Sequence, residues 1–305
     1  WLFKEFEVGG ANLENGDFQI CTCEKCKAET ATWSEDDAVF LGFQRRAYGP
    51  ALTAIEPLLK KKLVMWATYT GFVPGLPDMK GQIFPHCTHM LHSRNYTLGE
   101  RFPPDAITQW TLTGMVSDPP LPMSVFLDDG APAAALGNPN WPAGTKPATR
   151  RGVGFLHHAS QWNWKIPRYE LAISSIKEAC LRAYRAGLEG VSIHGEVDAR
   201  CIPWALNYLA FSHFIHWPED SLRQFGRNTL GVVLGSEKDG ETFVEILSAW
   251  QGGALTPDQK QCAEKTSADL HRRVACGTDL QRFRFWYWLN RMAAGGQDRM
   301  TASVV

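Results

Sequence analysis

Short apolar runs of strand character alternate along this chain with amphipathic runs of helical period. This alternation is typical of an α/β domain with parallel strands. Five strands are predicted, within residues 6–14, 63–70, 107–115, 152–162 and 188–197. No Gly-rich phosphate loop follows any of these runs, so the usual dinucleotide-binding sheet lacks its signature.

Helical periodicity is clearest in residues 169–187, where apolar side chains recur every three to four positions and Gly187 supplies a stop signal. A second, aromatic helix is expected in 203–217, just before Pro218. Residues 35–62 also have helical character, whereas 117–150 are rich in proline and are expected to form a long irregular excursion. From about residue 222 to the end we expect helices only.

Composition and charge exclude several classes of protein. The net charge of −1 gives the 305-residue chain no overall field that would draw it to nucleic acid or to a membrane surface. No apolar run reaches the roughly 18 residues that a membrane helix needs. A content of 44% hydrophobic and 21% charged residues is that of an ordinary globular protein. We therefore predict an α/β protein that binds neither nucleic acid nor membrane, and leave its oligomeric state open.

The predicted elements fit a (β/α)₈ TIM barrel better than an open doubly wound sheet, because polar and aromatic residues gather where the strands end. The chain starts at Trp1 in what reads as mid-domain sequence, so we expect the first strands of the barrel to lie upstream. Residues 1–218 would form the C-terminal portion of the barrel, and residues 219–305 a helical segment packed on it. Without its first strands such a barrel exposes unpaired edges, and poor solubility is expected.

Two acidic residues near predicted strand ends, Glu14 and Glu196, are the candidate catalytic pair. Strand counting places them about four strands apart, hence roughly across an eight-stranded mouth. Two carboxylates that face each other there could approach the roughly 5 to 9.5 Å separation used in glycoside hydrolysis. The alternative is structural: Glu14 caps a loop, and Glu196 forms an ion pair with a neighbouring Arg or His.

Other residues at the strand ends suit sugar binding, since indole rings stack on sugar faces while amides and imidazoles hold hydroxyls. Each also has a structural alternative, because Trp often fills a core, His is often hydrogen-bonded in the interior and Asp17 stands in turn-forming sequence. The predicted substrate-binding set is Asn12, Asp17, Trp66, Tyr69, Trp110, His157, Gln161, Trp162 and Asn207.

Three of the eight cysteines are clustered, at Cys21, Cys23 and Cys26. Three thiols can bind zinc if a fourth ligand arrives, and the stretch 86–92 contains His86, Cys87, His89 and His92 as candidates. A disulfide or structural thiols are the alternative, and it is favoured because the sequence has only one clean C-x₂-C knuckle. No metal site is therefore predicted.

Three stretches, in this order and spacing, carry a resemblance to a known group of proteins. They are GGANLENGDFQICTCEKCKA, RAYRAGLEGVSIHGE and ALNYLAFSHFIHWPEDSLRQF. Together they resemble the barrel of poorly characterised glycoside-hydrolase-like proteins related to α-glucuronidases, β-hexosaminidases and α-N-acetylglucosaminidases. The resemblance covers roughly residues 6–30 and 150–235. It implies a (β/α)₈ fold with Glu14 as the strand-four acid/base and Glu196 in the site. The chain lacks the adjacent Asp-Glu pair of the hexosaminidases, which speaks against substrate-assisted cleavage.

The sequence thus predicts a carbohydrate-active hydrolase, a glycosidase that acts on an oligo- or polysaccharide through two carboxylates and needs no cofactor. Three alternatives remain open. One is a non-catalytic barrel that binds glycans or serves as a scaffold, a second is a polysaccharide lyase, and a third is a zinc-stabilised protein in which the cysteines matter most. An extracellular or periplasmic location is expected if the substrate is a polysaccharide.

Overall fold

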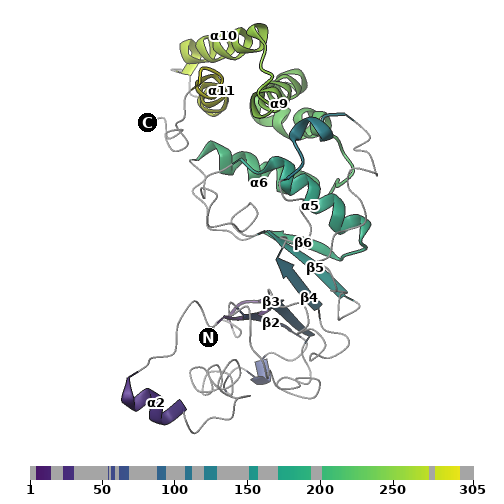
Figure 1. The fold of residues 1–305 in the computed structure, drawn as a ribbon, viewed down its shortest axis with the longest axis vertical. Coiled ribbons are helices and arrows are strands. Elements are labelled where there is room, and N and C mark those ends of the chain that lie inside the picture. Colours follow the sequence, from purple (N-terminus) through teal and green to yellow (C-terminus); the bar gives the residue numbers. More distant parts are fainter. Residues whose placement is uncertain are drawn as a thin grey trace. The chain divides into compact units, whose positions relative to one another are not determined.

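The computed structural model describes residues 5–14, 23–30, 54, 56–58, 62–68, 88–93, 107–111, 120–128, 151–156, 171–193, 201–274 and 279–295. The chain divides into two compact units (Figure 1). Unit 1 comprises Trp1–Thr111 and Trp141–Gly154, and unit 2 comprises Leu112–Asn140 and Phe155–Val305.

Unit 1 is built around strands that neighbour one another in chain order, of which β1 to β4 are parallel. Each of the first three pairs directly with its successor, and β5, which straddles the division between the units, follows β4 in the sheet. The strands are β1 (Gly10–Glu14), β2 (Leu63–Thr68), β3 (Thr88–Ser93), β4 (Ile107–Thr111) and β5 (Arg151–Leu156). Parallel strands in sequence order are what the alternating pattern predicted, and they require crossover connections. Unit 1 also contains α2 (Glu24–Thr30) and the short η2 (Glu56–Leu58).

The strand β3 was not predicted. Its sequence THMLHS is that of a polar histidine cluster and does not have the apolar pattern of a strand. It forms a strand through its pairing with β2 and β4. The remaining strand, β6 (Gly190–Ile193), belongs to unit 2, so the described residues contain six strands where the sequence predicted five. Glu14 ends β1, and β6 is the last described strand before Glu196. Counted along the chain, these two strands are five apart, whereas the sequence analysis placed them four apart.

In unit 2, α5 (Ile173–Arg185) packs against β6 and α6 (Ile202–Phe214). The predicted periodicity of α5 is confirmed by buried Ile173, Ile176 and Ala179, but Tyr184, which the pattern also placed on the apolar face, is 56% exposed. Gly187 has a φ of 70° just beyond the helix, a left-handed conformation that glycine adopts without strain. The irregular excursion predicted at 117–150 contains a short helical turn, η5 (Met123–Phe126), whose Phe126 is fully buried.

The helical character predicted after residue 222 is confirmed in the two described ranges, 222–274 and 279–295. A capping box at Ser221 and Gln224 starts α7 (Leu222–Phe225), which continues through the π-helical η6 (Gly226–Leu230) into α8 (Gly231–Leu234). Ser236 then caps α9 (Glu237–Gln251). The segment η6 crosses α9 very closely, because a Cβ added at Gly240 would lie only 1.9 Å from the carbonyl oxygen of Gly226.

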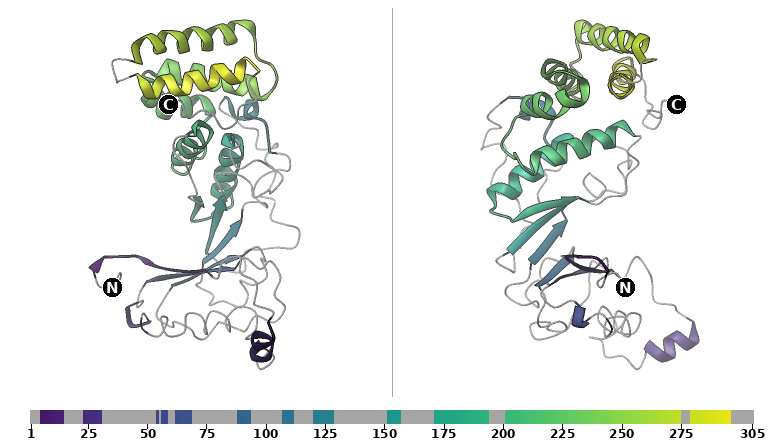
Figure 2. Two further views of the ribbon diagram at one scale, coloured as in Figure 1. Left: turned by 90° about the vertical axis from the view of Figure 1, so that its left-hand side faces the viewer. Right: turned by 180° about the vertical axis from the view of Figure 1, so that it is seen from behind.

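The last two helices, α10 (Pro257–Arg273) and α11 (Leu280–Ala293), lie side by side, as Figure 2 shows in both views. Thr256 and Gln259 form a capping box at the start of α10, with Pro257 in the first turn. The core between α9 and α11 is aromatic: Phe243 contacts the edges of Phe285 and Trp286, and all three are buried.

The predicted domain boundary at 218/219 falls inside unit 2. There α6 contacts α7, η6 and α11, and the backbone N–H of Arg223 donates to the carbonyl oxygen of Leu127 at 3.2 Å. The helical tail therefore packs on α6 and η5 as part of the same unit. None of the helices in the described part of the chain combines the length and hydropathy that a membrane crossing requires.

Candidate functional site

The register of the sheet in unit 1 aligns four residues where the strands end. Glu14 pairs with Ala67, Ala67 with His92, and His92 with Gln109, so one residue of each of β1 to β4 stands at the same level. Paired positions in a parallel sheet lie on the same face. We call these four residues the carboxyl-end row. The carboxyl ends of parallel strands are where α/β proteins place their sites.

The same register places Asn12 on the face of Glu14, two residues earlier in β1 and paired with Met65. Ile107 lies at this lower level on the same face, and it is 6% exposed. This face is therefore covered at Ile107, one level below the row. A covered sheet face with a carboxylate, an imidazole and an amide residue at its carboxyl edge has the composition of a binding site.

Two of the predicted sugar platforms lie on the opposite face of the sheet. Trp66 pairs with Leu13 and Leu91, and Trp110 pairs with Ser93, one position away from the row in each case. Because successive residues of a strand alternate between faces, the register separates these tryptophans from Glu14 and Asn12. The sequence analysis expected all four around one cavity, since it grouped strand-end residues without regard to face.

Several predicted site residues cannot be placed. Glu196, the second carboxylate, lies outside the described residues. So do Asp17, Tyr69, His157, Gln161 and Trp162. The roles assigned to them stay predictions.

Asn207, predicted to hold a sugar hydroxyl, is 1% exposed within α6. Its Oδ1 accepts a hydrogen bond from the backbone N–H of Ala172 at 2.7 Å. Ala172 stands immediately before α5, so this contact fixes the start of α5 against α6. The contact described for Asn207 is thus one that stabilises the packing of two helices.

The most strongly perturbed groups of unit 2 surround Lys177, which is fully buried in α5. Its Nζ donates to the carbonyl oxygen of Pro218 and lies 4.8 Å from the centroid of the Phe214 ring. Burial lowers the pKa of Lys177 from 10.5 to about 8. An amine with such a pKa could act as a base. However, Lys177 is only 1% exposed, and its observed partners join α5 to the end of α6, so its geometry is that of a structural link.

His213 lies beside this lysine and is also buried. Its Nδ1 lies 2.9 Å from the hydroxyl oxygen of Thr229 in η6, and its Nε2 lies 3.2 Å from a carboxylate oxygen of Asp220. Burial lowers the pKa of His213, and the charge of Lys177 acts in the same direction, whereas Asp220 raises it. The net effect is a lowered pKa, because the His213 side chain is 0% exposed while Asp220 is partly solvated. His213 is therefore held as a neutral ring that joins α6 to η6.

A buried ion pair in α5 is a third polar feature. Glu178 Oε1 accepts from Nε of Arg182 at 2.9 Å and from Nη2 at 2.8 Å, and the two side chains are 0% and 4% exposed. The other oxygen, Oε2, accepts from the backbone N–H of Leu121 at 3.2 Å. The pair thereby ties the segment before η5 to α5, and its carboxylate is engaged by described partners on both oxygens.

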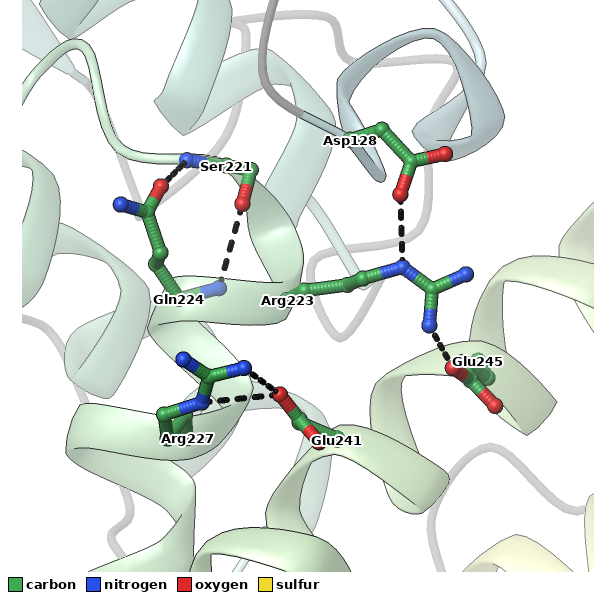
Figure 3. Close-up of polar contacts among 7 residues, drawn as sticks. All are labelled: Asp128, Ser221, Arg223, Gln224, Arg227, Glu241 and Glu245. Atoms are coloured by element: carbon green, nitrogen blue, oxygen red, sulfur yellow. Dashed lines mark hydrogen bonds and ion pairs between the residues drawn. The ribbon is translucent and has the colours of Figure 1, made fainter.

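A surface network joins η5, α7, η6 and α9, as Figure 3 shows. Arg223 donates from Nε to Asp128 at 2.7 Å and forms an ion pair with Glu245, while Arg227 donates from Nε to Glu241 at 2.9 Å. The Arg223 side chain is 38% exposed, and exposed pairs of this kind stabilise a fold only slightly. The network links helices of unit 2 and has no feature of a reactive site.

The cysteine hypotheses are only partly covered by the described residues. Cys23 is exposed next to α2, whereas Cys21, His86 and Cys87 lie outside the described ranges. Within those ranges, no three His, Cys, Asp or Glu side chains are placed to hold a metal ion. The buried Cys180 has a pKa raised to about 12 by burial, so its thiol is protonated and is a poor nucleophile.

The sequence analysis missed the place of His92 in the carboxyl-end row and treated this residue as a possible zinc ligand. No clear signal was present, because each of the two alternate sets in THMLHS mixes one apolar residue with two polar ones. Comparison of the chain with protein-family models, curated proteins and solved structures finds no match in any of the three.

Proposed function

We propose that this protein is a glycoside hydrolase and that its catalytic site lies at the carboxyl ends of β1 to β4. The observation that carries the proposal is the carboxyl-end row, in which Glu14 shares a level and a face with His92 and Gln109. A carboxylic acid at the same level as an imidazole and an amide residue suits a sugar, whose hydroxyls need donors and acceptors and whose cleavage needs an acid.

In this mechanism Glu14 is the general acid/base and Glu196 is the second carboxylate. Protonation of the glycosidic oxygen by Glu14 allows the bond to the anomeric carbon to break. Water then completes the reaction at that carbon, and the carboxylate acting as base takes its proton. The chemistry consumes one water and needs no cofactor.

The barrel frame of the proposal needs one change from the sequence-based expectation. Six strands follow one another in the described chain, so a β1 that is strand four would make β6 a ninth strand. If an eight-stranded barrel ends with β6, then β1 is its third strand. Glu14 is accordingly proposed as an acid at the end of a third strand, and the strand-four position implied by the resemblance is set aside.

The experiment compares Glu14→Gln and Glu196→Gln with the wild-type chain on a panel of 4-nitrophenyl α- and β-glycosides that includes glucuronides. Glu7→Gln is the matched control, because Glu7 is exposed before β1 and undergoes the same change. We expect both site variants to lose at least about 1000-fold in kcat, while the control keeps full activity.

Two other results would overturn the proposal. Turnover that survives Glu14→Gln contradicts the role of this carboxylate. A wild-type chain that binds glycans but hydrolyses none of the panel is a binding barrel. Release of unsaturated products, seen as absorbance of a new C=C bond, would instead identify a lyase.

A further inference from the structure

The segment between α6 and α7 contacts two buried basic side chains of unit 2. We call this segment, residues 215–220, the α6–α7 link. The carbonyl oxygen of Pro218 accepts from Nζ of Lys177, and the carboxylate of Asp220 lies 3.2 Å from Nε2 of His213. Both basic residues are 1% exposed, whereas the Asp220 side chain is 24% exposed. The link therefore joins buried charge to the surface.

Trp217 forms the aromatic part of the link. Its ring lies 5.3 Å from the ring of His213, measured between centroids, and the residue is 55% exposed. The backbone N–H of Trp217 donates to the carbonyl oxygen of His213 at 2.9 Å, and that of Asp220 donates to the carbonyl oxygen of Trp217 at 3.2 Å. The link is thus a hydrogen-bonded surface turn that rests on the histidine.

The two ring nitrogens of His213 differ in their hydrogen bonding. Nδ1 lies 2.9 Å from the hydroxyl oxygen of Thr229. Nε2 has no aligned hydrogen-bond partner among the described residues, although the carboxylate of Asp220 is close. A buried polar atom without an aligned partner is unfavourable. A movement of the link that admits water would satisfy this nitrogen.

The charges around the ring oppose a proton on it while it is buried. Among the described residues, α5 contributes the positive charge of Lys177 and the link contributes the negative charge of Asp220. The groups that meet the ring from η6 and α7 are uncharged, namely Thr229 and Phe225. The other titratable neighbours of this cluster act on Lys177, and they are Cys180, Arg185 and Glu219.

We propose that the α6–α7 link is a pH-dependent strap, which is closed over His213 and Lys177 while His213 is neutral and opens when His213 takes up a proton. The closed form disfavours the imidazolium because the ring is buried and faces Lys177. In the open form water solvates the ring, and its pKa returns to the ordinary value of about 6.5. Acidification therefore favours the open form. The proposal does not depend on the proposed glycosidase site.

Hydrogen–deuterium exchange of the full chain at about pH 7.5 and about pH 5 measures the opening, with each rate divided by that of an unstructured peptide at the same pH. Protection of the link amides should fall several-fold at the lower pH. The upper limit is about 30-fold, which one proton gives if it binds with a pKa of about 6.5 in the open form only. Lys177, with a pKa of about 8, stays largely protonated over this interval. Amides of α10, which lacks these groups, should keep their protection.

His213→Gln should abolish the response to pH. Its matched control is His216→Gln, the same change at an exposed histidine of the same link, which should keep the full response. Asp220→Asn leaves His213 in place and removes the charge that favours a proton in the closed form. Its response should be at least as large as that of the wild type, and this variant tests the strap even if His213→Gln does not fold.

Four results would overturn the strap. They are equal protection of the wild-type link at both pH values, a loss of protection that extends equally to α10, an undiminished response in folded His213→Gln, and a smaller response in Asp220→Asn than in the wild type.

Discussion

The close crossing of η6 and α9 makes Gly240→Ala a decisive substitution. Alanine is the better helix former, and by propensity alone the change inside α9 should stabilise the helix by about 1 kcal/mol. Sterics act in the opposite direction. The new Cβ would lie 1.9 Å from the carbonyl oxygen of Gly226 and 2.6 Å from the backbone nitrogen of Gly231.

The magnitude follows from what has to move. A Cβ rarely approaches a heavy atom within about 3 Å, so η6 and α9 must separate by about 1 Å, and both obstructing atoms belong to the backbone. Overpacking typically costs about 1–3 kcal/mol, and an obstruction with no flexible side chain should lie at the upper end. After subtraction of the helix gain, Gly240→Ala should lower the free energy of unfolding by about 2 kcal/mol.

The assay is urea unfolding of the full-length chain, followed by helical circular dichroism and by tryptophan fluorescence. Gly252→Ala is the matched control, because Gly252 ends α9 with a φ of −78° and its added Cβ would meet nothing closer than 3.4 Å. The control should be stabilised by roughly 0.4–1 kcal/mol. A Gly240→Ala chain as stable as the wild type would show that η6 and α9 do not cross this closely.

Three further predictions concern buried polar groups of unit 2. Because burial lowers the pKa of Lys177 from 10.5 to about 8, the unfolded chain binds the proton more tightly between these values, and the free energy of unfolding should rise from about pH 8 to 10.5. Lys177→Met should remove up to about 3 kcal/mol of that rise in urea titrations, and an unchanged pH profile would contradict it. Because the pKa of His213 is also lowered by burial, the free energy of unfolding should fall as the pH drops below about 6.5. His213→Gln should make this fall less steep, and an equally steep fall in the variant would contradict a neutral, buried His213. Glu178→Gln leaves the buried Arg182 opposite a neutral amide and should cost about 3 kcal/mol in thermal and urea unfolding, whereas Glu178→Gln with Arg182→Met should recover much of it; a harmless single change would contradict the pair.

Periodicity predicted the elements whose apolar residues follow the spacing of a helix or form one continuous run. In α5 the apolar positions recur at helical spacing, and in β2 a continuous apolar run stands between turn signals, so hydrophobic pattern and structure agree. The charges of α5 did not follow the pattern. Lys177 and Glu178 are buried because η5 and the end of α6 cover what would otherwise be the solvent face, and those contacts come from distant segments.

The strand β3 is the element that the hydrophobic pattern failed to predict. Its two histidines and two hydroxyl residues hide a strand that its neighbours β2 and β4 order by pairing on both edges. Omission of this strand shortened the count between Glu14 and Glu196, and the argument that placed the two carboxylates across a barrel mouth depended on that count. An error in one polar strand thus changed the predicted geometry of a site more than any misplaced helix boundary.

Residue identity alone could not assemble the candidate site, because membership depends on the face of the sheet as well as on the level. Alternation within β1 puts Asn12 and Glu14 together, and this much is readable from sequence. Whether Trp66 joins them depends on the register between β1 and β2. In the observed register Glu14 pairs with Ala67, and a shift of one residue would pair it with Trp66. That shift would put a tryptophan in the carboxyl-end row in place of an alanine. The register of two neighbouring strands therefore decides which residues stand at the level of the proposed acid Glu14, and this register comes from pairing between segments about 50 residues apart in the sequence.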